Sequence, residues 1–118
     1  IPDLISLRLV KNKGAAFSLL SNSTFFLSLL SLIVTIFLVI LILKRPPFSN
    51  LLAISLSFLL GGTIGNGFDR WSQGYVYDFI ELIPIQFPIF NVADIAINIA
   101  LICMFVDTLK KNNAKKYL

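Results

Sequence analysis

Three long apolar segments, residues 24–43, 48–68 and 89–109, dominate the pattern of hydrophobic and polar positions along the chain. The first two carry no charged residue, and each segment is close to the roughly 20 apolar residues that a helix needs to cross the hydrocarbon core of a bilayer. Lys44, Arg45 and two prolines end the first segment, because proline cannot continue a helix. The pattern predicts an all-α, multi-pass membrane protein with three transmembrane helices.

The stretches outside these segments follow a different pattern. Residues 1–22 begin with an alternation in which Ile5, Leu7 and Leu9 fall on one side of the chain, as is typical of a half-buried strand. Residues 69–88 form a loop with a second strand-like alternation. We expect a small β-sheet or strand region on the extracytoplasmic membrane surface.

Composition supports a membrane protein of one domain, residues 1–118. Hydrophobic residues make up 57% of the chain, charged residues 14%, and the mean hydropathy is +0.86, outside the range of soluble domains. The formal charge of +4 comes from lysines beside apolar runs, which favours a membrane surface over nucleic acid. The absence of histidine excludes Ser-His-Asp, Cys-His and HExxH zinc sites. Cys103, the single cysteine, is expected to be a small buried hydrophobe.

The distribution of basic residues predicts the orientation. The turn at 44–45 and the tail at 110–118 together hold six Lys and Arg, against four on the opposite side. The positive-inside rule then places the turn and the C-terminus in the cytoplasm. With three spans, Ile1 lies outside, so we expect a further helix upstream.

This topology gathers the polar residues of the chain at the outer surface. Asn12 and Gly14 suit a turn after the first strand, and Gly62, Asn66 and Arg70 share a helix face at i, i+4 spacing. The candidate site residues brought together at this surface are Asn12, Asn66, Arg70, Asp78, Asn91 and Asp94.

Some of these residues also have structural explanations. Asn91 and Asp94 have the spacing of a capping box at a helix start. Asp69 and Arg70 could form an interfacial anchor or ion pair. Gly61 and Gly65 make a GxxxG pair, for which close helix packing is the simpler explanation.

Asp78 has no such explanation, because Val76 and Ile80 share its side of the strand. If Asp78 and Asp94 meet, their repulsion at about 4 Å and an effective dielectric near 20 is about 4 kcal/mol. That corresponds to about three pK units, so one carboxyl would keep its proton near neutral pH. A neutral acid beside an ionised one is the arrangement of the aspartic proteases.

The motifs resemble the lipoprotein (type II) signal peptidase family, and they occur in the order of that family. The matching stretches are NKGAAF (12–17), GNGFDR (65–70), VYDF (76–79) and FNVAD (90–94). The resemblance implies an aspartic endopeptidase of the bacterial cytoplasmic membrane, with its active site at the outer face. Such enzymes remove the signal peptide of prolipoproteins before a diacylglyceryl-modified cysteine.

The resemblance also implies roles for individual residues. Asp78 and Asp94 would be the catalytic dyad, and Gly62 and Asp69 would give structural support. The residues that would bind substrate or orient the dyad are Asn12, Gly14, Asn66, Arg70 and Asn91. The implied partners are the prolipoprotein and membrane lipids, with no metal or other cofactor. The family has four spans, and its first helix has no counterpart here.

Two other functions remain open from the sequence. A presenilin-like protease would carry GxGD, whereas GNGFD has an extra residue between Gly67 and Asp69. A small multi-pass transporter or membrane assembly factor could use the aspartates to carry protons or ions, but would be expected to hold them near mid-membrane.

Overall fold

The computed structural model describes residues 1–14, 23–44 and 48–117. Residues 15–17 of the NKGAAF motif and the turn at 45–47 lie outside the described residues. Two strands and three helices follow one another in the order β1 (Ile5–Asn12), α1 (Thr24–Leu43), α2 (Asn50–Gln73), β2 (Val76–Leu82) and α3 (Val92–Lys115).

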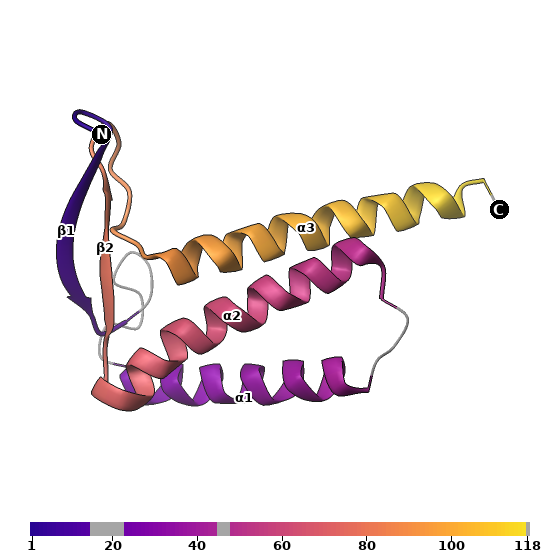
Figure 1. Cartoon of the computed structure of the whole chain (residues 1–118), viewed down its shortest axis with the longest axis horizontal. Helices are drawn as coiled ribbons and strands as arrows, with labels where there is room; N and C mark the ends of the chain where they lie inside the picture. Colours follow the sequence, from indigo (N-terminus) through magenta and orange to yellow (C-terminus); the bar gives the residue numbers. More distant parts are fainter. Residues whose placement is uncertain (15–22, 45–47, 118) are drawn as a thin grey trace.

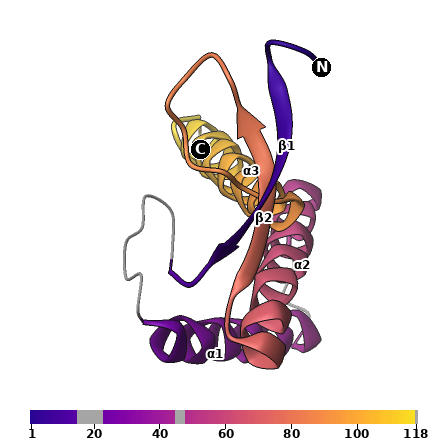
Figure 2. The ribbon, with the colours of Figure 1, turned by 90° about the vertical axis from the view of Figure 1, so that its left-hand side faces the viewer.

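The helices confirm the prediction of three membrane spans, since each is long and apolar enough to cross a bilayer. They run back and forth, with α2 packed against both α1 and α3, and the two strands stand across one end of the helices (Figures 1 and 2). α2 continues to Gln73, beyond the expected end at Phe68, and therefore carries Asp69 and Arg70 in its last turns. α3 runs from Val92 to Lys115, so the basic tail is largely helical.

Local sequence explains where the helices begin and end. The Ser49 hydroxyl accepts a hydrogen bond from the Leu52 amide as the N-cap of α2, which satisfies one of the free N–H groups of a first turn. Gly74 ends α2 with φ of 85°, a left-handed conformation that glycine adopts without strain. Asn91 and Asp94 form the predicted capping box of α3.

Close packing between α2 and α3 depends on Gly62. A Cβ at Gly62 would lie 2.6 Å from the Ala93 carbonyl oxygen and 2.6 Å from Ile97 Cγ1. A Cβ at Gly65 would lie 3.2 Å from Ala93 Cβ, whereas one at Gly61 would meet nothing within 4 Å. The expectation of close packing is therefore wrong for Gly61, because the turn of the helix points Gly62 at α3 instead.

β1 and β2 pair antiparallel, with Val10 opposite Asp78 and Asn12 opposite Val76. The register shifts between Leu7 and Val10, and an extra residue of this kind exchanges the two faces of a strand. The expected half-buried face of β1 is wrong: Leu7, which pairs with Ile80 before the shift, is 78% exposed, and Leu9, within the shift, is 70% exposed. Beyond the shift, Asn12 shares the inner face with Asp78.

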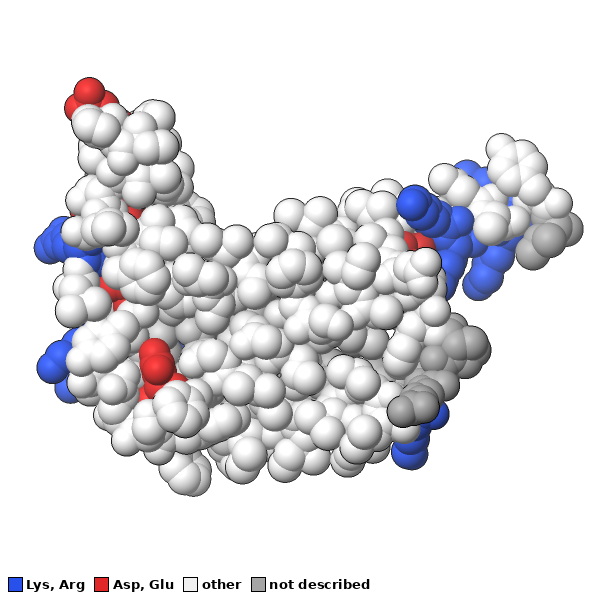
Figure 3. Space-filling model, in the orientation of Figure 1, with Lys and Arg blue, Asp and Glu red and all other residues white. Residues whose placement is uncertain are grey.

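Charge is distributed as a membrane protein requires. On the face drawn in Figure 3, basic and acidic side chains gather at the two ends of the molecule, and the long surface between them is uncharged. One charged end is the sheet, and the other carries the ends of α1 and α3. The uncharged surface corresponds to the apolar spans of the helices.

Candidate active site

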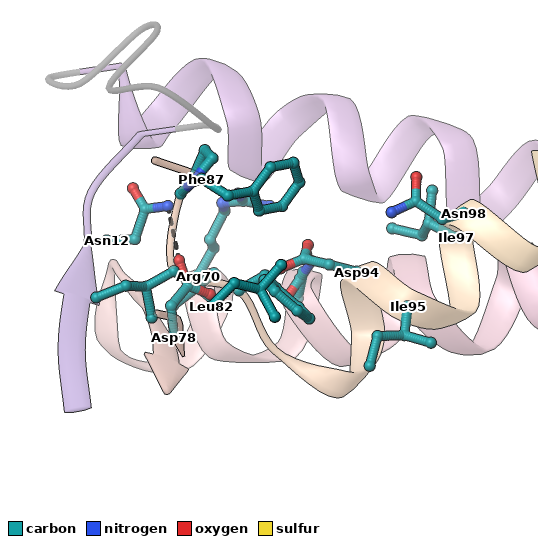
Figure 4. Close-up of a pocket in the computed structure, with 14 residues that line it drawn as sticks. Asn12, Arg70, Asp78, Leu82, Phe87, Asp94, Ile95, Ile97 and Asn98 are labelled. Atoms are coloured by element: carbon teal, nitrogen blue, oxygen red, sulfur yellow. Dashed lines mark hydrogen bonds between the residues drawn. The ribbon is translucent and has the colours of Figure 1, made fainter. Parts of the chain in front are cut away.

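A cavity of about 550 Å³ lies where the sheet meets the ends of α2 and α3. Its polar lining comes from four separate elements and consists of Asn12, Asn66, Arg70, Asp78, Asp94 and Asn98. Apolar side chains, among them Leu82, Phe87 and Ile95, line the rest (Figure 4). The cavity therefore combines a few converging polar groups with apolar walls, as ligand sites commonly do.

Asp78 lies on the inner face of β2 and is 3% exposed. Its Oδ2 accepts a hydrogen bond from Asn12 Nδ2 at 2.9 Å, and its Oδ1 accepts one from Asn91 Nδ2 at 2.8 Å. Burial raises the pKa of Asp78, and the charge of Asp94 raises it further. The hydrogen bonds from the two asparagines and the charge of Arg70 lower the pKa but do not cancel the effect of burial.

Asp94 occupies the first turn of α3 and has two functions there. Its Oδ2 accepts a hydrogen bond from the Asn91 backbone amide at 3.0 Å, which closes the capping box. Its Oδ1 accepts a hydrogen bond from Asn66 Nδ2 at 3.0 Å and so takes part in the polar lining of the cavity. Asp94 therefore makes the contacts of a capping box and also a contact in the polar lining of the cavity.

Two asparagines connect the carboxylates. Asn91 Nδ2 donates to Asp78 Oδ1 and also to Asn66 Oδ1 at 2.9 Å. Asn66 in turn donates to Asp94. Asn66 and Asn91 are 7% and 5% exposed, and buried networks of this kind hold their members in one arrangement.

Asn12 is oriented by the turn that follows β1. Its Oδ1 accepts a hydrogen bond from the Gly14 amide at 2.8 Å, which leaves Nδ2 to face Asp78. Arg70 Nη2 donates to the Gly14 carbonyl at 3.3 Å. Gly14 thus acts through its backbone, and Arg70 links the end of α2 to the same turn.

Two of the predicted residues lie beside the site. Gly62 packs beneath it, where α2 meets α3. Asp69 does not line the cavity, and within residues 1–14, 23–44 and 48–117 it makes no ion pair with Arg70. Of the two structural alternatives for Asp69 and Arg70, an interfacial anchor or an ion pair, the ion pair is wrong, because the guanidinium reaches the Gly14 carbonyl instead.

The sequence prediction missed Asn98 and the aromatic lining. Asn98 follows Asp94 by four residues on α3, and it lines the cavity. The signal was available: an amide in an apolar span, on the helix face of a candidate catalytic acid. Phe87 and Phe90, in the loop between β2 and α3, stack edge to face with centroids 5.8 Å apart; no strand or helix period marks these positions.

The fold and the site together define a class of membrane protein. A buried carboxyl with a raised pKa and a second, hydrogen-bonded carboxylate share a cavity at the end of membrane helices. In the described part of the chain, no three His, Cys, Asp or Glu side chains come together as metal ligands would. The arrangement is that of a membrane site able to perform acid–base chemistry with two aspartates.

Comparison with known proteins identifies the family. The model of the signal peptidase (SPase) II family matches residues 1–110. A lipoprotein signal peptidase of Parasynechococcus marenigrum is 50% identical over 99% of this chain and 74% of its own length. One from Enterococcus faecalis is 38% identical over 98% of this chain and 72% of its own length.

A solved structure agrees with the sequence relatives. A bacterial membrane enzyme superposes with a TM-score of 0.89 at 32% identity, over 98% of this chain and 71% of the other. The chain belongs to the signal peptidase II family, whose members are peptidases that remove signal peptides from prolipoproteins. It is a multi-pass membrane protein of the hydrolase class.

Proposed function

We propose that Asp78 and Asp94 are the catalytic dyad with which this protein removes signal peptides from prolipoproteins, cutting before a diacylglyceryl-modified cysteine. The observation that carries the proposal is the connection of the two carboxyls through Asn91 and Asn66 in one cavity. Asn12, Gly14 and Arg70 would hold the dyad and the substrate backbone, while Gly62 and Asp69 would support the helices around them.

The mechanism requires the pair to share one proton. One carboxylate takes a proton from water as the water oxygen attacks the scissile carbonyl carbon. The other carboxyl polarises the carbonyl and then gives its proton to the leaving nitrogen as the C–N bond breaks. The raised pKa of Asp78 supports this scheme, since a carboxyl that keeps its proton to higher pH than usual is better suited to act as an acid.

Substitution of each dyad aspartate tests this proposal. Asp78→Asn and Asp94→Asn keep the shape of the side chain but cannot ionise, so each should lower kcat by a factor of about 10² to 10⁴. The measurement is cleavage of a lipidated precursor by purified protein in detergent, with thermal unfolding measured in parallel. Asp69→Asn, which precedes Arg70 on α2 but does not line the cavity, is the matched control and should lower yield more than turnover. Near-normal turnover of either dyad variant would refute the two-aspartate mechanism.

The lipid on the substrate cysteine should contribute to recognition. The cavity has apolar walls and lies at the end of the membrane spans, and each methylene buried there contributes about 0.8 kcal/mol. A precursor peptide with diacylglycerol should therefore be cleaved at least tenfold faster than the same peptide without it. Equal rates would refute the lipid requirement and leave the peptidase assignment standing.

The proposed location is the bacterial cytoplasmic membrane, with the C-terminus in the cytoplasm and the cavity at the outer face. The basic ends of α1 and α3 support this orientation, because they lie opposite the sheet and follow the positive-inside rule.

A further inference from the structure

Asn98 is a polar side chain that neither the dyad nor the helix ends require. It lies on α3 four residues after Asp94 and lines the same cavity. In Figure 4 it stands at the opposite side of the cavity from Asn12, farther along α3 from the sheet, and its side chain is exposed rather than packed between helices. Among the residues that the structure describes, its amide has no hydrogen-bond partner, although Asn12, Asn66 and Asn91 are all bonded.

The position of Asn98 within an apolar span gives its unpartnered amide a free-energy cost. Four residues of helix advance by about 6 Å, so Asn98 lies that much farther into the apolar span than Asp94. A polar group without a partner in the hydrocarbon region costs free energy, and such groups are by default functional. The neighbouring Ile97 packs on Gly62, which fixes the phase of α3 at this point.

The backbone of a bound substrate could supply the hydrogen-bond partners that Asn98 lacks. A peptide bond can be attacked only where its backbone is not helical, and an unwound backbone in an apolar environment has N–H and C=O groups without partners. A side-chain amide carries both a donor and an acceptor, so one asparagine can bond both groups of a single peptide unit. A serine or a carboxylate could not do this equally well.

We propose that Asn98 is a positioning residue that hydrogen-bonds the signal-peptide backbone on the membrane side of the scissile bond. The separation of about 6 Å from Asp94 corresponds to about two residues of extended chain at 3.3 Å each. The peptide unit that it binds is therefore the second one upstream of the cleaved bond. The inference rests on the proposed function, because it assumes that a peptide occupies this cavity.

The test pairs an enzyme variant with a backbone change in the substrate. Asn98→Leu keeps the size of the side chain and removes the amide, and Asn112→Leu, on the same helix outside the cavity, is the matched control. The substrate is a diacylglyceryl-modified precursor peptide in which one upstream peptide bond at a time is replaced by an ester. An ester removes the N–H donor and weakens the carbonyl acceptor.

One hydrogen bond is worth a factor of about 3 to 10 in rate. We expect the ester at the second upstream position to lower kcat/KM of the wild-type protein by that factor. Asn98→Leu should lower kcat/KM by a similar factor with the all-amide peptide, mainly through KM, and should be insensitive to that ester. Its thermal stability in detergent should be unchanged or higher, because an unpartnered amide has been removed.

The outcomes separate this inference from the proposed function. If Asn98→Leu cleaves the all-amide peptide at the normal rate, the role of Asn98 is refuted while the peptidase function stands. The same holds if the ester at the second upstream position lowers kcat/KM of Asn98→Leu as much as it lowers kcat/KM of the wild-type protein. A fall in thermal stability together with an unchanged KM would show a purely structural role and would also refute it. Failure of the wild-type protein to cleave the all-amide peptide would refute the proposed function itself.

Discussion

At the scale of single residues, the site consists mostly of amides that hold two acids. Asp78 accepts hydrogen bonds from Asn12 and Asn91, and both bonds lower its pKa against the larger effect of burial. The pKa of Asp78 is therefore set by opposing effects, and removing one hydrogen-bond donor raises it.

Asn12→Ala should shift the pH dependence of cleavage. Loss of the Asn12 hydrogen bond raises the pKa of Asp78 further, because that bond stabilises the ionised form. If Asp78 acts as the base, activity is lost as pH falls through this pKa; if it acts as the acid, activity is lost as pH rises through it. In either case the limb of the pH–activity profile that reflects the titration of Asp78 moves to higher pH in the variant.

The measurement is kcat/KM of a lipidated precursor as a function of pH. Lys11→Gln is the control, since Lys11 neighbours Asn12 on β1 but faces Tyr75 on the other side of the sheet. Its profile should match that of the wild-type protein. A limb that stays in place, or moves to lower pH, in Asn12→Ala would contradict the assigned hydrogen bond.

Most of these polar residues could be predicted as neighbours from the sequence. Membrane topology alone brings Asn12, Asn66 and Asp78 to one surface, because each lies at the same end of the spans or in a stretch that connects them there. Their pairing could not be predicted, since which amide faces which carboxylate depends on the turn at Gly14 and on the capping box at Asp94.

At the scale of elements, two misjudged faces have a common cause. The alternation of Ile5, Leu7 and Leu9 is real, but the register shift relative to β2 exchanges the faces of β1 before Asn12 is reached. The GxxxG spacing is also real, but the position of α3 selects Gly62 rather than Gly61. A periodic pattern gives the faces of an element, and only the neighbouring element decides which face is used.

Gly62→Ala should destabilise the protein by about 1–3 kcal/mol, because the added methyl would meet the Ala93 carbonyl and Ile97. Cleavage should fall as well, since α2 and α3 carry Asn66 and Asp94. Gly61→Ala is the matched control and should be neutral or stabilising by up to about 1 kcal/mol, because its methyl meets nothing within 4 Å. The measurement is thermal unfolding in detergent; equal effects of the two substitutions would contradict the packing described for Gly62.

At the scale of the whole molecule, the spans were the most predictable feature. Apolar segments of about 20 residues have few alternatives to a transmembrane helix, and the three helices agree with that prediction. Their ends were less predictable: α2 continues through Asp69 and Arg70 to Gly74, because helix ends depend on capping residues rather than on hydropathy.

The proposed orientation can be tested by labelling in intact cells. With Cys103 replaced by serine, a cysteine introduced at Gln73 should react with a membrane-impermeant thiol reagent, because α2 ends there beside the sheet. A cysteine introduced at Asn113, in the basic end of α3, should be protected until the membrane is opened. The reverse pattern would overturn the orientation and move the cavity to the cytoplasmic face.

The capping box of α3 also has a consequence for biogenesis. The carboxylate of Asp94 is fixed by the first turn of the helix that it begins, and α3 follows β2, which carries Asp78. The two carboxyls can therefore reach the arrangement proposed for catalysis only after α3 has formed. A growing chain that has emerged as far as Leu82 already contains Asp78 but has no partner for it. We expect such a chain, arrested on the ribosome, to leave a precursor uncut, so the order of synthesis itself keeps the unfinished protease inactive.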